Sequence, residues 1–149
     1  MDDSARRHGD VGHEDKYTHC DILHILTRAM ANKTGQDLID EAKQQIKEVT
    51  PEQVRDMQAR NERTIYLDVR EPNEWNLGRI PQAIHLPRGN LETKVEAIID
   101  RGQKVVIYCA RGNRSALAAL TMKQMGYEDV ASMSRGFQGW AEIDGEVEG

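Results

Sequence analysis

The chain has 149 residues and a formal net charge of −5, a size that fits one domain of ordinary dimensions with a modest extension. The acidic balance argues against a general affinity for nucleic acid or for anionic membrane surfaces. Two cysteines are too few for a disulfide framework. No apolar stretch reaches the roughly 20 residues that a membrane-spanning helix needs. We therefore expect a cytoplasmic protein that binds neither nucleic acid nor membranes.

The first 31 residues differ from the rest of the chain. Residues 1–18 are polar and short of apolar side chains, which is typical of a mobile tail. Four histidines and one cysteine lie in this region: His8, His13, His19, His24 and Cys20. Their spacing matches no familiar pattern of metal ligands, so a tail is favoured over a metal site. We predict a flexible polar tail over residues 1–31, with Met30 as an alternative start of translation.

Regular periodicity begins at Thr34. Leu38, Ile39, Ala42 and Ile46 recur at helical spacing, which predicts an N-terminal helix over residues 32–47. Thr50-Pro51-Glu52-Gln53 predicts the start of a second helix, because a capping hydroxyl is followed by Pro at the first helical position and by Gln three residues on. The next predicted elements are a strand over 64–69, a short helix over 71–77 and a strand over 83–86.

The second half of the chain continues the alternation. An amphipathic helix is expected over 91–100, and residues 104–108 form the most apolar run, which suits a central strand covered on both faces. The remaining predicted elements are a helix over 115–125, a strand over 130–133 and a short helix over 136–140. Trp75 and Trp140 are expected to anchor the core. Strands that alternate with helices predict an α/β fold with a mostly parallel sheet and helices on both faces.

The segment that follows the central strand carries the chemistry. In an open parallel sheet, ligands bind at the carboxyl ends of the strands, and Cys109 stands at that position. Gly112 lets the backbone curl, and the start of the next helix adds partial positive charge. Arg111 and Arg114 add two full positive charges, which favour the nucleophilic thiolate of Cys109. The pattern predicts Cys109 as the catalytic residue, in an anion-binding loop of Ala110, Arg111, Gly112, Asn113, Arg114 and Ser115.

Four motifs resemble those of the rhodanese family and follow one another in the family's order. In this chain they are Leu67 to Glu71, Gly78 to Pro87, the Cys109 to Arg114 loop, and Arg135 to Trp140. The likeness covers about residues 48–143 and implies a rhodanese-like domain over 48–145, with a sheet of about five strands. The chain departs from the family pattern at Arg79, where His is usual, and at Gln82 and Gln138, which replace glycines.

The resemblance implies a sulfurtransferase that works through a persulfide. Cys109 attacks the outer sulfur of thiosulfate or of another sulfane-sulfur donor, and a thiol, cyanide or a thioredoxin-like protein then accepts the sulfur. Arg111 and Arg114 orient the donor anion, and Ser115 hydrogen-bonds to the loop or to the persulfide. Asp68 and Arg70 are expected to form a supporting structural pair. We expect no metal and no organic cofactor.

Other functions of the same family stay open. Related phosphatases have one residue more between Cys and Arg, and the tighter loop here suits a sulfane sulfur better than a phosphoryl group. Arsenate reduction, a persulfide carrier without turnover and a non-catalytic interaction module are further alternatives. The interaction module is disfavoured because inactive copies usually lose the cysteine. Cys20 could also resolve the persulfide as a disulfide.

Overall fold

The computed structural model describes residues 21–23 and 32–149. Apart from residues 21–23, the predicted tail lies outside these residues, together with its histidines, Cys20 and Met30. The chain divides into two units, Met1–Lys33 and Thr34–Gly149. The described part of the first unit is helical over residues 21–23, and all elements described below belong to the second.

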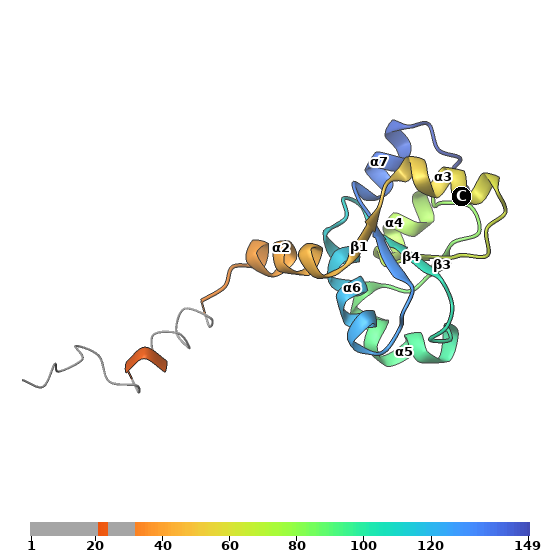
Figure 1. Cartoon of the computed structure of the whole chain (residues 1–149). Coiled ribbons are helices and arrows are strands. Elements are labelled where there is room, and N and C mark those ends of the chain that lie inside the picture. The colour runs from red at the N-terminus through yellow and green to blue at the C-terminus, as the bar shows by residue number, and fades with distance from the viewer. Residues whose placement is uncertain (1–20, 24–31) are drawn as a thin grey trace, which may run out of the picture. The chain divides into compact units, whose positions relative to one another are not determined.

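The second unit alternates helices and strands (Figure 1). In chain order its elements are α2 (Gly35–Gln45), β1 (Lys47–Val49), α3 (Pro51–Ala59), β2 (Ile65–Asp68), α4 (Pro72–Leu77), β3 (Ile84–His85), the 3-10 turn η1 (Arg88–Asn90), α5 (Leu91–Ile98), β4 (Val105–Tyr108), α6 (Asn113–Gln124), β5 (Val130–Met133) and α7 (Gly136–Glu142). Among the described residues, none of the helices is long and apolar enough to cross a membrane.

The strands form one five-stranded sheet in the order β1-β5-β4-β2-β3. Every pair of neighbouring strands is parallel, so the predicted α/β fold with a parallel sheet of about five strands is confirmed. The central strand is β4, whose four residues are all buried. This agrees with the apolar, β-branched run that predicted a strand covered on both faces.

Helices cover both faces of the sheet, and β4 contributes alternate side chains to each. Val105 and Ile107 pack with residues of α5 and α6 on one face. Val106 and Tyr108 pack with residues of α3 and α7 on the other. In Figure 1, α5 and α6 accordingly lie on one side of the strands, and α3 and α7 on the other. Trp140 is 1% exposed and belongs to the second core, as expected.

Two elements differ from the sequence-based expectation. The first helix ends at Gln45, and Lys47–Val49 forms the edge strand β1, which pairs with β5. Trp75 does not anchor the core, because α4 has six residues, none of them fully buried. Its indole instead stacks on His85 with the ring centroids 4.8 Å apart, and the guanidinium of Arg79 lies 4.4 Å from its centre.

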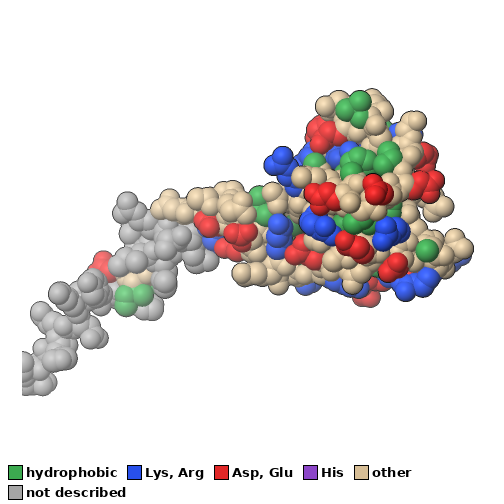
Figure 2. Space-filling model, turned by 90° about the horizontal axis from the view of Figure 1, so that it is seen from above, with side chains coloured by type: hydrophobic (Ala, Val, Ile, Leu, Met, Phe, Trp, Pro, Cys, Tyr) green, Lys and Arg blue, Asp and Glu red, His purple; other side chains and the backbone are tan. Residues whose placement is uncertain are grey.

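The N-terminal helix packs on the rest of the unit. The helix α2 lies against α6, and Ala42 is the residue that it buries there. Lys43 donates a hydrogen bond to Asn113 Oδ1 over 3.1 Å, which connects α2 to the first residue of α6. The surface of the unit carries mixed charge: Figure 2 shows Lys and Arg side chains interspersed with Asp and Glu over the visible face.

Candidate active site

Cys109 lies in the short loop between the central strand and α6. The strand β4 ends at Tyr108 and α6 begins at Asn113, with Gly112 as its N-cap in the left-handed region at φ 95°. A side chain at Gly112 would also press against the backbone of the β5–α7 loop, since a Cβ there would lie 3.3 Å from Arg135 N and 3.4 Å from Met133 O. The loop therefore needs glycine at this position.

Backbone N–H groups converge on the sulfur. The Cys109 Sγ, in a side chain that is 1% exposed, accepts hydrogen bonds from Gly112 N over 3.1 Å and from Ser115 N over 3.4 Å. These donors and the start of α6 stabilise negative charge on the sulfur or on an atom attached to it. Within the described part of the chain, the N–H groups of Ala110, Arg111, Asn113 and Arg114 have no hydrogen-bond acceptor. The predicted loop therefore has donors left for an anion.

A pair of buried serines lies behind the sulfur. The Cys109 thiol donates to Ser115 Oγ over 3.5 Å, and Ser115 Oγ lies 2.8 Å from Ser132 Oγ. Both serines are completely buried. Sequence reasoning did not identify Ser132 as part of the site. The available signal was one polar residue in an otherwise apolar strand, and β5 pairs with β4 so that Ser132 lies opposite Ile107.

The first residues of α7 hold the cysteine loop through their main chain. Phe137 N donates to Cys109 O over 2.7 Å, and Gln138 N donates to Ala110 O over 3.0 Å. Gly136 precedes them with φ 54°. The Arg135 to Trp140 motif thus lies beside the cysteine loop, although the two are separated in sequence.

Arg114 forms an ion pair with Glu74 of α4. Its Nη1 and Nη2 donate to the two carboxylate oxygens over 2.9 and 3.0 Å. The hydrogen bonds from Arg114 lower the pKa of Glu74 from 4.5 to about 2. Glu74 also accepts a hydrogen bond from Glu71 N over 2.8 Å. Sequence reasoning missed this carboxylate, because Glu at the third position of a helix looks like an ordinary capping residue.

The other loop arginine, Arg111, is exposed. Among the described residues it has neither an ion pair nor a hydrogen bond from its guanidinium. The two arginines that the sequence places together on the loop therefore differ. Arg114 is compensated by a carboxylate, whereas Arg111 has no carboxylate partner in the part of the chain that the structure describes.

Asp68 and Arg70 form a buried ion pair at the end of β2. Arg70 Nη2 lies 2.7 Å from Asp68 Oδ2 and also donates to Gly78 O over 2.7 Å. The guanidinium lies 4.3 Å from the centre of the Phe137 ring. Burial alone would lower the pKa of Arg70, but the hydrogen bonds and charge of Asp68 raise it above its usual value. Through Gly78 the pair connects β2 to the end of α4, and through Phe137 it connects β2 to the Arg135 to Trp140 motif beside the cysteine loop.

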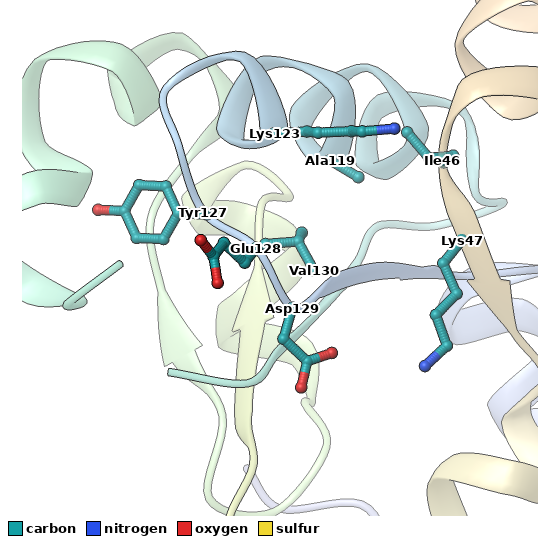
Figure 3. Close-up of a pocket in the computed structure, with 8 residues that line it drawn as sticks. All are labelled: Ile46, Lys47, Ala119, Lys123, Tyr127, Glu128, Asp129 and Val130. Carbon is teal, nitrogen blue, oxygen red and sulfur yellow. The ribbon is translucent and has the colours of Figure 1, made fainter. Parts of the chain in front are cut away.

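A cavity of about 130 Å³ lies at the opposite ends of the strands. Figure 3 shows its lining residues: Ile46, Lys47, Ala119, Lys123, Tyr127, Glu128, Asp129 and Val130. Lys47 and Val130 begin their strands, whereas Cys109 follows the end of β4. This cavity is therefore separate from the cysteine loop. Within residues 21–23 and 32–149, no group of three or more His, Cys, Asp or Glu side chains could hold a metal ion.

Comparison with known proteins gives consistent matches. The family model for the Rhodanese-like domain matches residues 50–143. The Bacillus subtilis protein YrkF, whose name marks it as a provisional sulfur carrier protein, is 30% identical over 130 residues, covering 87% of this chain and 68% of YrkF. MoeZ of Mycobacterium tuberculosis, named a probable adenylyltransferase/sulfurtransferase, is 30% identical over 94 residues. That match covers 62% of this chain but only 24% of MoeZ.

A solved structure from Rhodopseudomonas palustris shares the fold. It superposes with a TM-score of 0.71 at 31% sequence identity, covering 78% of this chain and 96% of that one. That protein is described as being of unknown function and a possible tyrosine phosphatase.

Proposed function

Because the chain belongs to the rhodanese-like domain family, we propose that it is a sulfurtransferase that moves sulfane sulfur through a persulfide on Cys109. One observation carries the proposal: at the carboxyl end of the central strand, the Cys109 sulfur accepts hydrogen bonds from the N–H groups of Gly112 and Ser115. A sulfur in this position is a nucleophile whose charge the loop stabilises both before and after it gains a second sulfur.

The reaction has two displacement steps. The Cys109 thiolate attacks the outer sulfur of thiosulfate or of a persulfide, and a new S–S bond forms on Sγ. The bond between the donor's two sulfurs breaks, and its electron pair leaves on sulfite or on the donor thiolate. A thiophilic acceptor, such as a thiol, cyanide or a thioredoxin-like protein, then attacks the outer sulfur of the Cys109 persulfide and releases the Cys109 thiolate.

The loop residues divide the work of holding charge. The backbone N–H groups of Gly112 and Ser115 stabilise the charge on the sulfur, and the unused N–H groups of the same loop are available to the donor anion. The Ser115 hydroxyl, positioned by Ser132, donates to the sulfur once the thiol proton is lost. Asp68 and Arg70 act as supporting residues through their contacts with Gly78 and Phe137.

A carrier without multiple turnover is the second candidate, and the name of YrkF as a sulfur carrier supports it. The name of MoeZ supports a sulfurtransferase. Both functions use the same persulfide, and they differ in whether small donors and acceptors are turned over. Steady-state turnover with thiosulfate and cyanide would favour the enzyme, and single loading without turnover would favour the carrier.

Phosphatase activity is less well supported by the loop. The N–H groups of Gly112 and Ser115 lie 3.1 and 3.4 Å from the sulfur itself. A phosphoryl group on the sulfur would place its oxygens one bond further out, where a wider loop is needed to surround them. Four residues between Cys109 and Arg114 make a smaller ring than that of the related phosphatases.

The proposal is tested by the intact mass of the full chain after incubation with thiosulfate, and separately with an alkyl persulfide. We expect the wild type to gain one sulfur atom that a thiol reductant removes, and Cys109→Ser to gain none. Circular dichroism of the variant controls for its fold. A gain retained by Cys109→Ser, or no gain in the wild type with either donor, would contradict the proposal. Hydrolysis of 4-nitrophenyl phosphate by the wild type would then favour the phosphatase alternative.

A further inference from the structure

Glu74 cancels one of the positive charges that the cysteine loop would otherwise offer to a substrate. Both of its oxygens accept hydrogen bonds from Arg114. The pair is partly buried, with 35% of the Arg114 side chain and 28% of the Glu74 side chain exposed. A bidentate Arg–carboxylate pair of this kind is geometrically specific and stronger than a single contact between a point charge and a carboxylate. Arg114 therefore adds little net charge to the site.

The arginine on the adjacent loop is compensated in the same way. Arg135 at the start of α7 pairs with Glu52 Oε2 over 2.8 Å and lies 3.6 Å from Glu142. Of the three arginines on the two loops around Cys109, Arg111 is the one without a carboxylate partner among the described residues. These three arginines therefore contribute a net positive charge of about one unit, to which Lys43 adds a second cation through its hydrogen bond to Asn113 Oδ1.

Sulfane-sulfur donors differ in how much negative charge they bring. Attack of the Cys109 thiolate on thiosulfate assembles three negative charges, which end as a persulfide anion and a sulfite dianion. Attack on a protonated persulfide R–S–S–H involves one negative charge. The products are the neutral Cys109 persulfide and a thiolate RS⁻, which carries that charge. In both reactions the Sγ–S bond forms as the donor's S–S bond breaks, and the electron pair leaves on the departing group. A site in which carboxylates neutralise two of its three arginines suits the second reaction better.

We infer that the site takes its sulfur from thiol persulfides in preference to thiosulfate, and that Glu74 sets this preference by neutralising Arg114. The inference rests on the proposed function, because it concerns the donor that loads Cys109. Glu74 is then a specificity-determining residue that acts on the donor through Arg114. The exposed charge of Arg111 remains as the group that meets the donor.

The test compares loading of Cys109 by two donors, thiosulfate and 2-hydroxyethyl persulfide, in single-turnover reactions followed by intact mass. The informative variant is Glu74→Gln, which removes the negative charge beside Arg114 and leaves a side-chain oxygen that can accept the hydrogen bond from Glu71 N. The matched control is Glu96→Gln, which removes one charge from another Arg–Glu pair, with Arg101, at 3.2 Å on the surface. Arg111→Gln removes the loop arginine that has no carboxylate partner among the described residues.

We expect the wild type to load faster from the persulfide than from thiosulfate. Glu74→Gln should raise the second-order rate constant for thiosulfate by about tenfold, the effect of one unit of charge acting on a dianion in a partly screened site. Loading from the persulfide should change by no more than about twofold in the same variant, which also shows that the loop is intact. Glu96→Gln should change neither rate, and Arg111→Gln should slow loading from thiosulfate most.

Two results would overturn the inference while leaving the proposed function in place. One is a wild type that loads from thiosulfate as fast as from the persulfide. The other is a Glu74→Gln protein that loads from the persulfide at the normal rate but loads from thiosulfate no faster than the wild type. Failure of the wild type to gain sulfur from either donor would instead overturn the proposed function, and the inference with it.

Discussion

Gly136 lies in close contact with the backbone of Cys109 and Ala110, and Gly136→Ala tests whether that contact holds the site together. A Cβ at this residue would collide with Cys109 O and would lie 2.6 and 2.7 Å from the carbonyl carbon and oxygen of Ala110. All three are backbone atoms, so no side chain can rotate away. The residue also has φ 54°, in the left-handed region that side chains disfavour.

These two effects set the expected magnitude. Forcing a methyl group into a well-packed interior costs about 1–3 kcal/mol. The left-handed backbone adds about 1 kcal/mol for a residue with a Cβ. We therefore expect Gly136→Ala to lower the free energy of unfolding by about 2–4 kcal/mol, a large part of the 5–15 kcal/mol typical of a domain. Because the collision falls on Cys109 and Ala110, sulfur loading should also slow.

Urea denaturation followed by circular dichroism measures the first effect, and single-turnover loading of Cys109 measures the second. The matched control is Gly102→Ala, since a Cβ at Gly102 meets nothing within 4 Å and its φ lies outside the left-handed region. The control should unfold within about 0.5 kcal/mol of the wild type. A loss below about 1 kcal/mol for Gly136→Ala, with normal loading, would show that the backbone of the cysteine loop shifts freely and would refute the reasoning.

Three further changes have defined outcomes. Asp68→Ala should lower the free energy of unfolding by about 3–5 kcal/mol in urea, because it leaves the buried charge of Arg70 without its partner, and a loss below about 1 kcal/mol would contradict the pairing. Ser132→Ala should cost about 1–2 kcal/mol and slow sulfur loading, because the buried hydroxyl of Ser115 keeps only its contact with Cys109; unchanged loading would remove Ser132 from the site. The third concerns pH. The folded pKa of Glu74 is about 2, below the ordinary 4.5, so its pair stabilises the fold fully above pH 4.5 and loses this effect as the pH falls toward 2. The stability difference between wild type and Glu74→Gln should therefore be at most about 1 kcal/mol at neutral pH, given the partial exposure, and should vanish across that window in pH-dependent denaturation; a constant difference would contradict the assignment.

The sequence predicted the parallel sheet because its central features are local. The run Lys104 to Tyr108 is apolar and β-branched, and it is followed at once by Cys109, Gly112 and a helix start. These signals depend on neighbouring residues, and the observed β4, loop and α6 follow them closely. The start of α6 lies two residues earlier than expected, at Asn113, because a left-handed glycine already turns the chain into the helix.

The strand β1 was not predicted, because nothing in Lys47-Glu48-Val49 indicates a strand without its partner. Two of its three residues are exposed and charged, and the segment becomes a strand by pairing with β5, far along the chain. The same reason explains the missed role of Glu74, which meets Arg114 across 40 residues of sequence. Such contacts depend on the tertiary arrangement, which a single sequence does not show.

Trp75 illustrates a further limit of sequence reasoning. Its size and apolar ring favour the core, but the packing position of a residue depends on how deeply its helix lies. In α4 the ring of Trp75 instead stacks on His85 and contacts the guanidinium of Arg79. Trp140, in a helix that packs on the sheet, does reach the core.

The two edge strands of the sheet, β1 and β3, affect how the protein behaves at high concentration. β1 has three residues and β3 has two, so each edge exposes few unpaired N–H and C=O groups. β1 also presents the charged side chains of Lys47 and Glu48. Short edges with charged residues are poor templates for the addition of a strand from another molecule, which is the first step of many aggregation routes. The short, charged edges thus disfavour self-association of a sheet that is built from apolar strands.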